Sequence, residues 1–135
     1  MNRDDFINEI ANGVSEFSLI REKLESTILI KGENVLLSYL REFKISTPSI
    51  LADVLDVTPA RIAAILRSLE KKDFIFRGID LEDKRRVVVE LTEKGREFAE
   101  KLKSDIEEHS LALFDALGET DATEFLRLIK KISEI

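Results

Sequence analysis

The stretch ISTPSILADVLDVTPARIAAILRSLEKKDF, residues 45–74, contains two Thr-Pro pairs, at positions 47–48 and 58–59. A threonine hydroxyl can accept a hydrogen bond from a free backbone N–H of the first helical turn. Proline suits the first helical position, where no N–H partner is lost. Each pair therefore predicts a helix start. Because only residues 56–58 separate the two short helices, the stretch predicts a helix-turn-helix.

The apolar period changes after residue 72. Phe74, Ile75 and Phe76 form one β-prone run, and residues 87–91 form another. The residues between them are mostly polar, so this pattern predicts a hairpin with a long, polar loop. A helix-turn-helix followed by such a two-stranded wing is an arrangement that reads nucleic acid.

Amphipathic helices are predicted on both sides of this motif. Apolar residues at three- to four-residue intervals, or multiples of them, predict one long helix from about residue 6 to 28, and another over about 35–43. A further helix starts at 92–95 and ends at Gly118, and Asp121 with Glu124 predicts a capping box for the last helix. The expected fold is mainly α with a small β-wing: an N-terminal dimerisation helix (1–30), a winged helix-turn-helix domain (31–91) and C-terminal dimerisation helices (92–135).

The bulk properties of the chain restrict its chemistry. It has 135 residues, no cysteine and a single histidine, which excludes disulfides, thiolate metal sites and a multi-histidine zinc site within one chain. We expect no metal, no cofactor and no enzymatic activity, since few nucleophile or base arrangements remain. No apolar run approaches the roughly 20 residues that span a bilayer, and the N-terminus lacks a secretory signal. We therefore expect a cytoplasmic protein without a membrane partner.

The charges are unevenly distributed. A net charge of -6 at first argues against a nucleic-acid partner, because neutralisation of phosphates dominates such binding. However, residues 57–91 carry 8 basic and 6 acidic side chains and are net positive, whereas the rest of the chain is net negative. An anionic partner is therefore expected to meet this stretch.

The second Thr-Pro helix has two distinct sides at about 100° per residue. Ile62, Ile65, Leu66 and Leu69 share the side expected to face the core. The other side combines small residues, which let the backbone approach bases, with cations and hydroxyls for phosphates and base edges. We expect the helix-turn-helix to contact DNA through Thr47, Thr58, Ala60, Arg61, Ala64, Arg67, Ser68 and Lys71. The alternative is an ordinary solvated face.

The loop of the hairpin carries a basic triplet, Lys84, Arg85 and Arg86, that no β-turn requires. Arginine is well suited to the narrow, electronegative minor groove. Asp83 could hold Arg85 extended by a charge-assisted hydrogen bond. These four residues are therefore expected to form a DNA-contacting wing, the alternative being a solubilising loop whose charges pair locally.

Nearly the whole chain resembles the MarR (multiple antibiotic resistance regulator) family of winged-helix transcription factors. Residues 51–77, LADVLDVTPARIAAILRSLEKKDFIFR, resemble its helix-turn-helix, and DLEDKRRVVVELTEKG, residues 80–95, is similar to its wing signature of aspartate, arginine and Leu-Thr-x-x-Gly. The resemblance implies homodimers on pseudo-palindromic operators, with recognition helices in successive major grooves, Arg85 in the minor groove and Asp83 orienting it.

The sequence departs from the family at three positions. Ala64 stands where many members carry arginine, Arg61 where threonine is frequent, and Asp73 where glycine usually ends the recognition helix. Aspartate tolerates the left-handed conformation better than most residues, so we expect the turn at Asp73 to be kept. Base readout is expected to rest on arginines, alanine methyl contacts and DNA shape.

The terminal helices carry more apolar surface than a small winged domain can cover, and such patches usually mark an interface. The predicted dimer interface comprises Phe6, Ile10, Phe114, Phe125, Ile129 and Ile132, the alternative being a closed monomeric core. Family effectors are often small anionic aromatics, for which Phe17, Tyr39 and Phe43 are the candidate pocket. The alternative function is a winged-helix module for protein interaction or ligand sensing with little DNA affinity.

Overall fold

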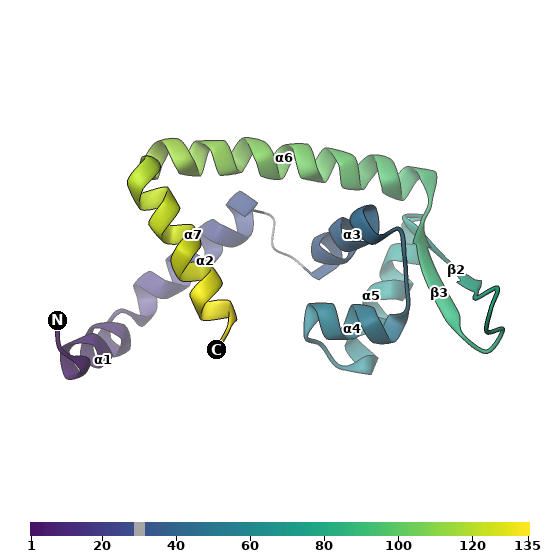
Figure 1. Cartoon of the computed structure of the whole chain (residues 1–135), viewed down its shortest axis with the longest axis horizontal. Coiled ribbons are helices and arrows are strands. Elements are labelled where there is room, and N and C mark those ends of the chain that lie inside the picture. The colour runs from purple at the N-terminus through teal and green to yellow at the C-terminus, as the bar shows by residue number, and fades with distance from the viewer. Residues whose placement is uncertain (29–31) are drawn as a thin grey trace. The chain divides into compact units, whose positions relative to one another are not determined.

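The computed structural model of the chain describes residues 1–28 and 32–135, except for the side chains of Val14, Phe17 and residues 24–28. The elements in chain order are α1 (Arg3–Asn12), α2 (Val14–Ile28), α3 (Gly32–Phe43), β1 (Ile45–Ser46), α4 (Pro48–Leu55), α5 (Pro59–Lys71), β2 (Ile75–Ile79), β3 (Val87–Leu91), α6 (Glu93–Leu117) and α7 (Glu119–Ser133) (Figure 1). The predicted fold class, mainly helical with a small β-wing, is confirmed. Within the described part of the chain, every helix is too short or too polar to cross a membrane.

The chain divides into two compact units, Lys31–Glu108 and Met1–Ile30 with His109–Ile135. In the first, which we call the winged unit, helices α3, α4 and α5 pack together and against the strands. Its core is formed by Leu36, Leu37, Leu40, Leu51, Ile62, Ile65, Leu66, Leu69, Ile75, Val89, Leu91 and Ala99. The predicted inward side of α5 is thus buried. Each large apolar side chain contributes about 1.5–3 kcal/mol of transfer free energy. Two buried residues, Ala99 of this core and Leu102, belong to α6. The winged unit therefore extends beyond residue 91 into α6.

The sheet of the winged unit has three antiparallel strands in the order β1-β3-β2. The predicted hairpin is formed by β2 and β3, with Ile75 opposite Leu91 and Ile79 opposite Val87. It projects from the helices of this unit in Figure 1. The sequence did not predict β1, because a two-residue strand has no periodicity and is defined only by its pairing with β3.

Both Thr-Pro pairs start helices as predicted. Thr47 Oγ1 accepts a hydrogen bond from Ile50 N at 3.3 Å, and Thr58 Oγ1 accepts one from Arg61 N at 3.1 Å. After α5, Asp73 adopts the expected left-handed conformation, with φ 62°. The starts of both helices of the helix-turn-helix are therefore capped by local hydrogen bonds that the sequence encodes.

Residues 92–95 attach the start of α6 to the end of the turn after α5. Thr92 Oγ1 donates a hydrogen bond to Asp73 O at 2.6 Å and accepts one from Gly95 N at 3.0 Å. A Cβ atom at Gly95 would lie 1.9 Å from Phe74 O, so only glycine allows this approach. The Phe74 ring also stacks on Phe98, with 4.6 Å between ring centroids. These contacts give the Leu-Thr-x-x-Gly sequence a structural reason.

Two predictions about the terminal helices are wrong. The first helix is interrupted at Gly13, whose N–H donates to Glu9 O and closes α1; glycine is about 1 kcal/mol less favourable than alanine within a helix. The last helix has no capping box, because α7 already begins at Glu119 and no side-chain cap bond forms. Asp121 lies in its first turn, and Glu124 instead accepts a hydrogen bond from Arg127 Nε at 2.9 Å.

Candidate nucleic-acid interface

The outward side of α5 presents a row of cations separated by small residues. Arg61, Arg67 and Lys71 are exposed, as are Thr58 and Ala60 at the start of the helix, whereas Ala64 and Ser68 are half-buried. The narrow centre of this side lets the helix backbone approach a groove wall, while the longer side chains reach phosphates and base edges. The arrangement has the shape and charge of a groove-reading helix.

Thr47 does not share this exposure. It is buried, and its hydroxyl is engaged in the cap of α4. The predicted DNA contact by its side chain therefore does not fit its position, because the hydroxyl serves the fold.

Ser68 has a partner that the sequence did not reveal. Its Oγ donates a hydrogen bond to Glu33 Oε1 at 2.6 Å, and Lys72 Nζ lies 2.7 Å from Glu33 Oε2. Burial by itself raises the pKa of Glu33, but hydrogen bonds from Lys72 and Ser68 and the charges of Lys72 and Arg61 outweigh it. The pKa of Glu33 therefore lies below its ordinary value of 4.5. No local pattern could have shown this contact, because Glu33 and Ser68 are 35 residues apart.

A second ion pair joins α5 to the wing. Arg77 on β2 donates a hydrogen bond from Nε to the carboxylate of Glu70 near the end of α5. Both side chains are partly exposed, so the pair contributes little stability. It is a direct side-chain contact between β2 and α5.

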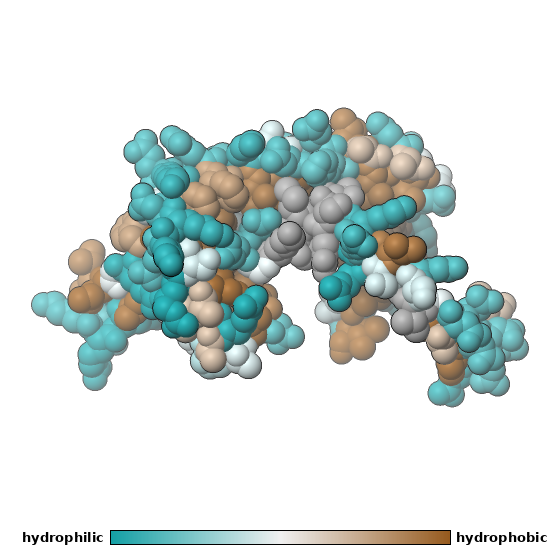
Figure 2. Space-filling model, turned by 180° about the vertical axis from the view of Figure 1, so that it is seen from behind, coloured by the Kyte–Doolittle hydropathy of each residue, from teal (hydrophilic) through white to brown (hydrophobic). Residues whose placement is uncertain are grey.

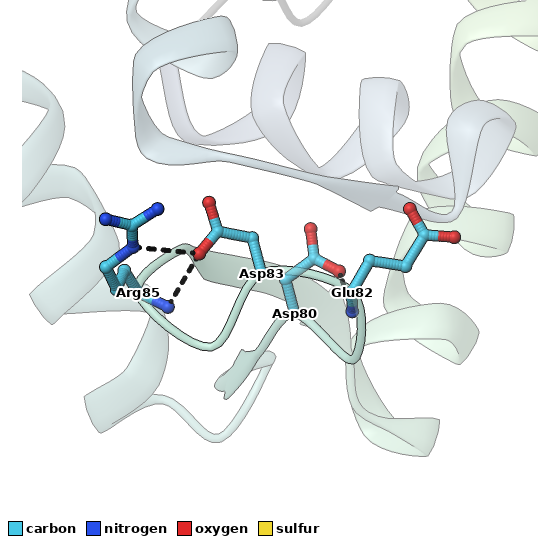
Figure 3. A network of polar contacts seen from close by, with 4 residues as sticks. All are labelled: Asp80, Glu82, Asp83 and Arg85. Atoms are coloured by element: carbon cyan, nitrogen blue, oxygen red, sulfur yellow. Dashed lines mark hydrogen bonds and ion pairs between the residues drawn. The ribbon is translucent and has the colours of Figure 1, made fainter.

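The tip of the wing is organised by its aspartates (Figure 3). Asp80 Oδ1 accepts a hydrogen bond from Glu82 N at 3.0 Å, and Asp83 Oδ1 accepts one from Arg85 N, also at 3.0 Å. Arg85 Nε lies 3.3 Å from the same Asp83 oxygen, while the Arg85 side chain is 93% exposed. Lys84 and Arg86 are exposed beside it. The loop thus presents a guanidinium to solvent with one edge restrained by Asp83.

The other compact unit exposes apolar side chains. Phe6, Ile10, Phe114, Ile129 and Ile132 are all at least 41% exposed, and Phe125 is half-buried. Apolar surface of this unit is visible in brown at the right of Figure 2. A groove of about 380 Å³ lies between α6 and α7, lined by Leu113, Phe114, Leu117, Ala122, Phe125, Leu126, Ile129 and Ser110. Its walls are almost entirely apolar, as in a surface that another chain covers.

The predicted effector pocket is only partly described. Tyr39 and Phe43 lie together on α3, with ring centroids 4.5 Å apart, and Phe43 is exposed. Phe17 belongs to α2, and its side chain lies outside the described residues. The three-residue pocket stays a prediction.

Comparisons with known proteins agree with this geometry. Residues 34–109 match a family model described as a winged helix DNA-binding domain. The HTH-type transcriptional regulator YhbI of Bacillus subtilis (strain 168) is 32% identical over 112 residues, which cover 79% of this chain and 72% of that protein.

Solved structures show the same fold. A mutant of MarR from E. coli, complexed with operator DNA, has a TM-score of 0.77 at 23% identity, and the match covers 93% of this chain and 96% of that chain. BpsR of Bordetella bronchiseptica, whose DNA binding is regulated by 6-hydroxynicotinic acid, has a TM-score of 0.71 at 19% identity, covering 87% and 92%.

Proposed function

Because the chain belongs to the winged helix DNA-binding domain family and is a transcriptional regulator of the MarR type, we propose that it binds a pseudo-palindromic operator as a homodimer. In each subunit, α5, which begins after Thr58, enters the major groove. The wing, residues 78–86, lies at the minor groove with Arg85 inserted. The observation that carries the proposal is the exposed basic side of α5 in the same compact unit as the exposed Arg85.

The proposal assigns few side chains to contacts with base edges. Arg61 and Arg67 can each donate two hydrogen bonds to guanine, and the methyl groups of Ala60 and Ala64 can contact thymine methyls. The triplet 84–86 and Lys71 contact phosphates or the minor groove, so DNA shape supplies part of the selectivity. The operator affinity therefore depends strongly on salt.

The homodimer is proposed from the exposed apolar side chains of α1, α6 and α7. Leaving them in water forfeits about 25 cal/mol for each Å² of apolar surface that a second copy could cover. A dimer would also hold two recognition helices about one DNA turn apart, ~34 Å. Dimerisation by Phe6, Ile10, Phe114, Phe125, Ile129 and Ile132 thus serves both stability and operator reading.

A small aromatic effector is a further proposal. It is supported by the regulation of BpsR by 6-hydroxynicotinic acid and by the aromatic pair Tyr39 and Phe43. No enzymatic activity is proposed, since the relatives that match are transcriptional regulators.

The experiment that tests DNA binding is a selection of bound duplexes from a random pool, followed by gel-shift titration over a salt series. We expect two symmetric half-sites about one helical turn apart and a binding constant that falls steeply with salt. Absence of duplex binding in dilute buffer contradicts the proposal. The net charge of -6 favours a protein-binding winged-helix module as the second candidate, and that outcome selects it.

A further inference from the structure

A carboxylate of the protein itself, that of Glu33, lies beside the face of α5 that is proposed to contact DNA. Glu33, in the first turn of α3, accepts hydrogen bonds from Ser68 Oγ at 2.6 Å and Lys72 Nζ at 2.7 Å. One hydroxyl and one ammonium converging on an anion is the donor set that DNA-binding proteins direct at phosphate oxygens. In this chain the anion is supplied by the protein itself.

The place of Glu33 makes this contact relevant to DNA. A groove of about 340 Å³ between the start of α3 and α5 is lined by Gly32, Glu33, Asn34, Arg61, Ala64, Ile65 and Ser68. Arg61, Ala64 and Ser68 belong to the proposed DNA-contacting side, so Glu33 stands at the edge of the same surface. The Lys72 side chain remains 51% exposed and the Glu33 side chain 32% exposed, so a competing anion can reach both.

We propose that Glu33 is a positioning residue that lowers the affinity for DNA, because its carboxylate takes the place of a backbone phosphate on Ser68 and Lys72. Duplex DNA must either displace this carboxylate, which breaks the ion pair between Glu33 and Lys72, or bind beside it, which leaves Lys72 neutralised. The effect is independent of base sequence, since phosphates carry no sequence information. This inference rests on the proposed function.

Glu33→Gln tests the inference, because glutamine keeps the shape and an acceptor oxygen but loses the charge. Releasing Lys72 adds about one phosphate contact, so the slope of log K against log salt should become steeper by about 0.9, and affinity should rise about tenfold at about 0.1 M salt. Operator and unrelated duplexes should gain equally. A purely structural role for Glu33 would change thermal unfolding without steepening the salt slope.

Two further variants locate the effect. Glu42→Gln removes one negative charge from an exposed position of the same helix and should leave the salt slope unchanged. Glu33→Gln with Lys72→Met should return the slope to the wild-type value, because the released ammonium is gone. If Glu33→Gln does not fold, as judged by thermal unfolding, Glu33→Ala is measured in its place.

The outcomes separate this inference from the proposed function. If the wild type and Glu33→Gln both ignore duplex DNA, the proposed function fails. If the wild type binds DNA and Glu33→Gln binds with equal or lower affinity and an unchanged slope, the role of Glu33 is overturned. A gain in affinity that persists fully without Lys72 also overturns it, since the lysine is then not the group that Glu33 holds.

Discussion

Arg85 extends into solvent from a loop in which Asp83 accepts hydrogen bonds from both its backbone and its guanidinium. Replacing it with alanine removes the proposed minor-groove contact without disturbing any buried side chain. We expect Arg85→Ala to weaken operator binding by about 1–3 kcal/mol, measured by gel-shift titration at fixed salt. Arg96→Ala, at an exposed position on α6, is the matched control. Unchanged affinity for Arg85→Ala would show that the Arg85 side chain takes no part in DNA binding.

The buried hydroxyl of Ser46 is expected to lower the stability of the fold. It is only 4% exposed, and its Oγ finds no hydrogen-bond partner within the described part of the chain. A buried hydroxyl without a partner loses its hydrogen bonds to water and forms none within the protein. We expect Ser46→Ala to raise the free energy of unfolding by about 1 kcal/mol in chemical denaturation. Ser49→Ala, at an exposed site, should not, and a loss of stability in Ser46→Ala would show that the hydroxyl is paired.

Glu33 gives a pH-dependent contribution with a definite sign. Its pKa is lowered in the folded chain, so the stability that it adds is fully present above the unfolded value and is lost as the pH falls through the folded value. The wild type should therefore exceed Glu33→Gln in free energy of unfolding near neutrality, by about 1 kcal/mol or less because the pair is partly exposed.

That difference should shrink in acid, below a pH of about 4.5. Urea denaturation of both proteins across this range measures it. A difference that stays constant with pH would show that the carboxylate does not act through its charge.

At the scale of elements, the start of α6 is fixed by backbone proximity. A Cβ atom at Gly95 would meet Phe74 O at 1.9 Å, whereas one at Gly78 would meet Val88 Cγ2 at an ordinary 3.5 Å. Gly95→Ala must therefore separate α6 from the turn before β2, and we expect it to destabilise the winged unit by several kcal/mol, on the order of 3.

Gly78→Ala serves as the comparison in the same sheet, with an expected change of about 0.5 kcal/mol or less. Thermal unfolding of the two variants measures the difference. Equal stability of the two variants would mean that the backbone at Gly95 and Phe74 can move apart at little cost in free energy.

At the scale of the whole molecule, the apolar groove between α6 and α7 is proposed to be covered by a second copy. Ile129 lines this groove and is 42% exposed, so Ile129→Glu would place a charge in the interface, where its desolvation is costly. We expect a monomer in sedimentation velocity and operator binding weakened by on the order of a hundredfold, since the two half-site contacts are no longer linked.

Lys130→Glu puts the same side chain at an exposed neighbouring position of α7 and should leave the dimer intact. If the wild type sediments as a monomer, or if Ile129→Glu remains a dimer that binds the operator normally, the proposed interface is wrong.

The helix-turn-helix, the hairpin and the family could all be predicted from the amino-acid sequence alone. Thr47, Thr58 and Asp73 specify helix starts and a left-handed turn through bonds within a few residues, and the inward side of α5 follows from a period of 3.6. Such local rules do not depend on the rest of the fold. The Asp83 and Arg85 contact is likewise local, because only two residues separate its partners.

Which of these side chains remain available to a partner depends instead on how the chain packs. The burial of Thr47, the strand β1 and the carboxylate that binds Ser68 and Lys72 all depend on segments distant in sequence. Residues 33 and 68 have no local pattern that relates them. They meet because α3 packs against α5 to bury apolar side chains, and this packing brings the neighbouring polar side chains into contact. Burial and pairing at the site therefore depend on the tertiary fold.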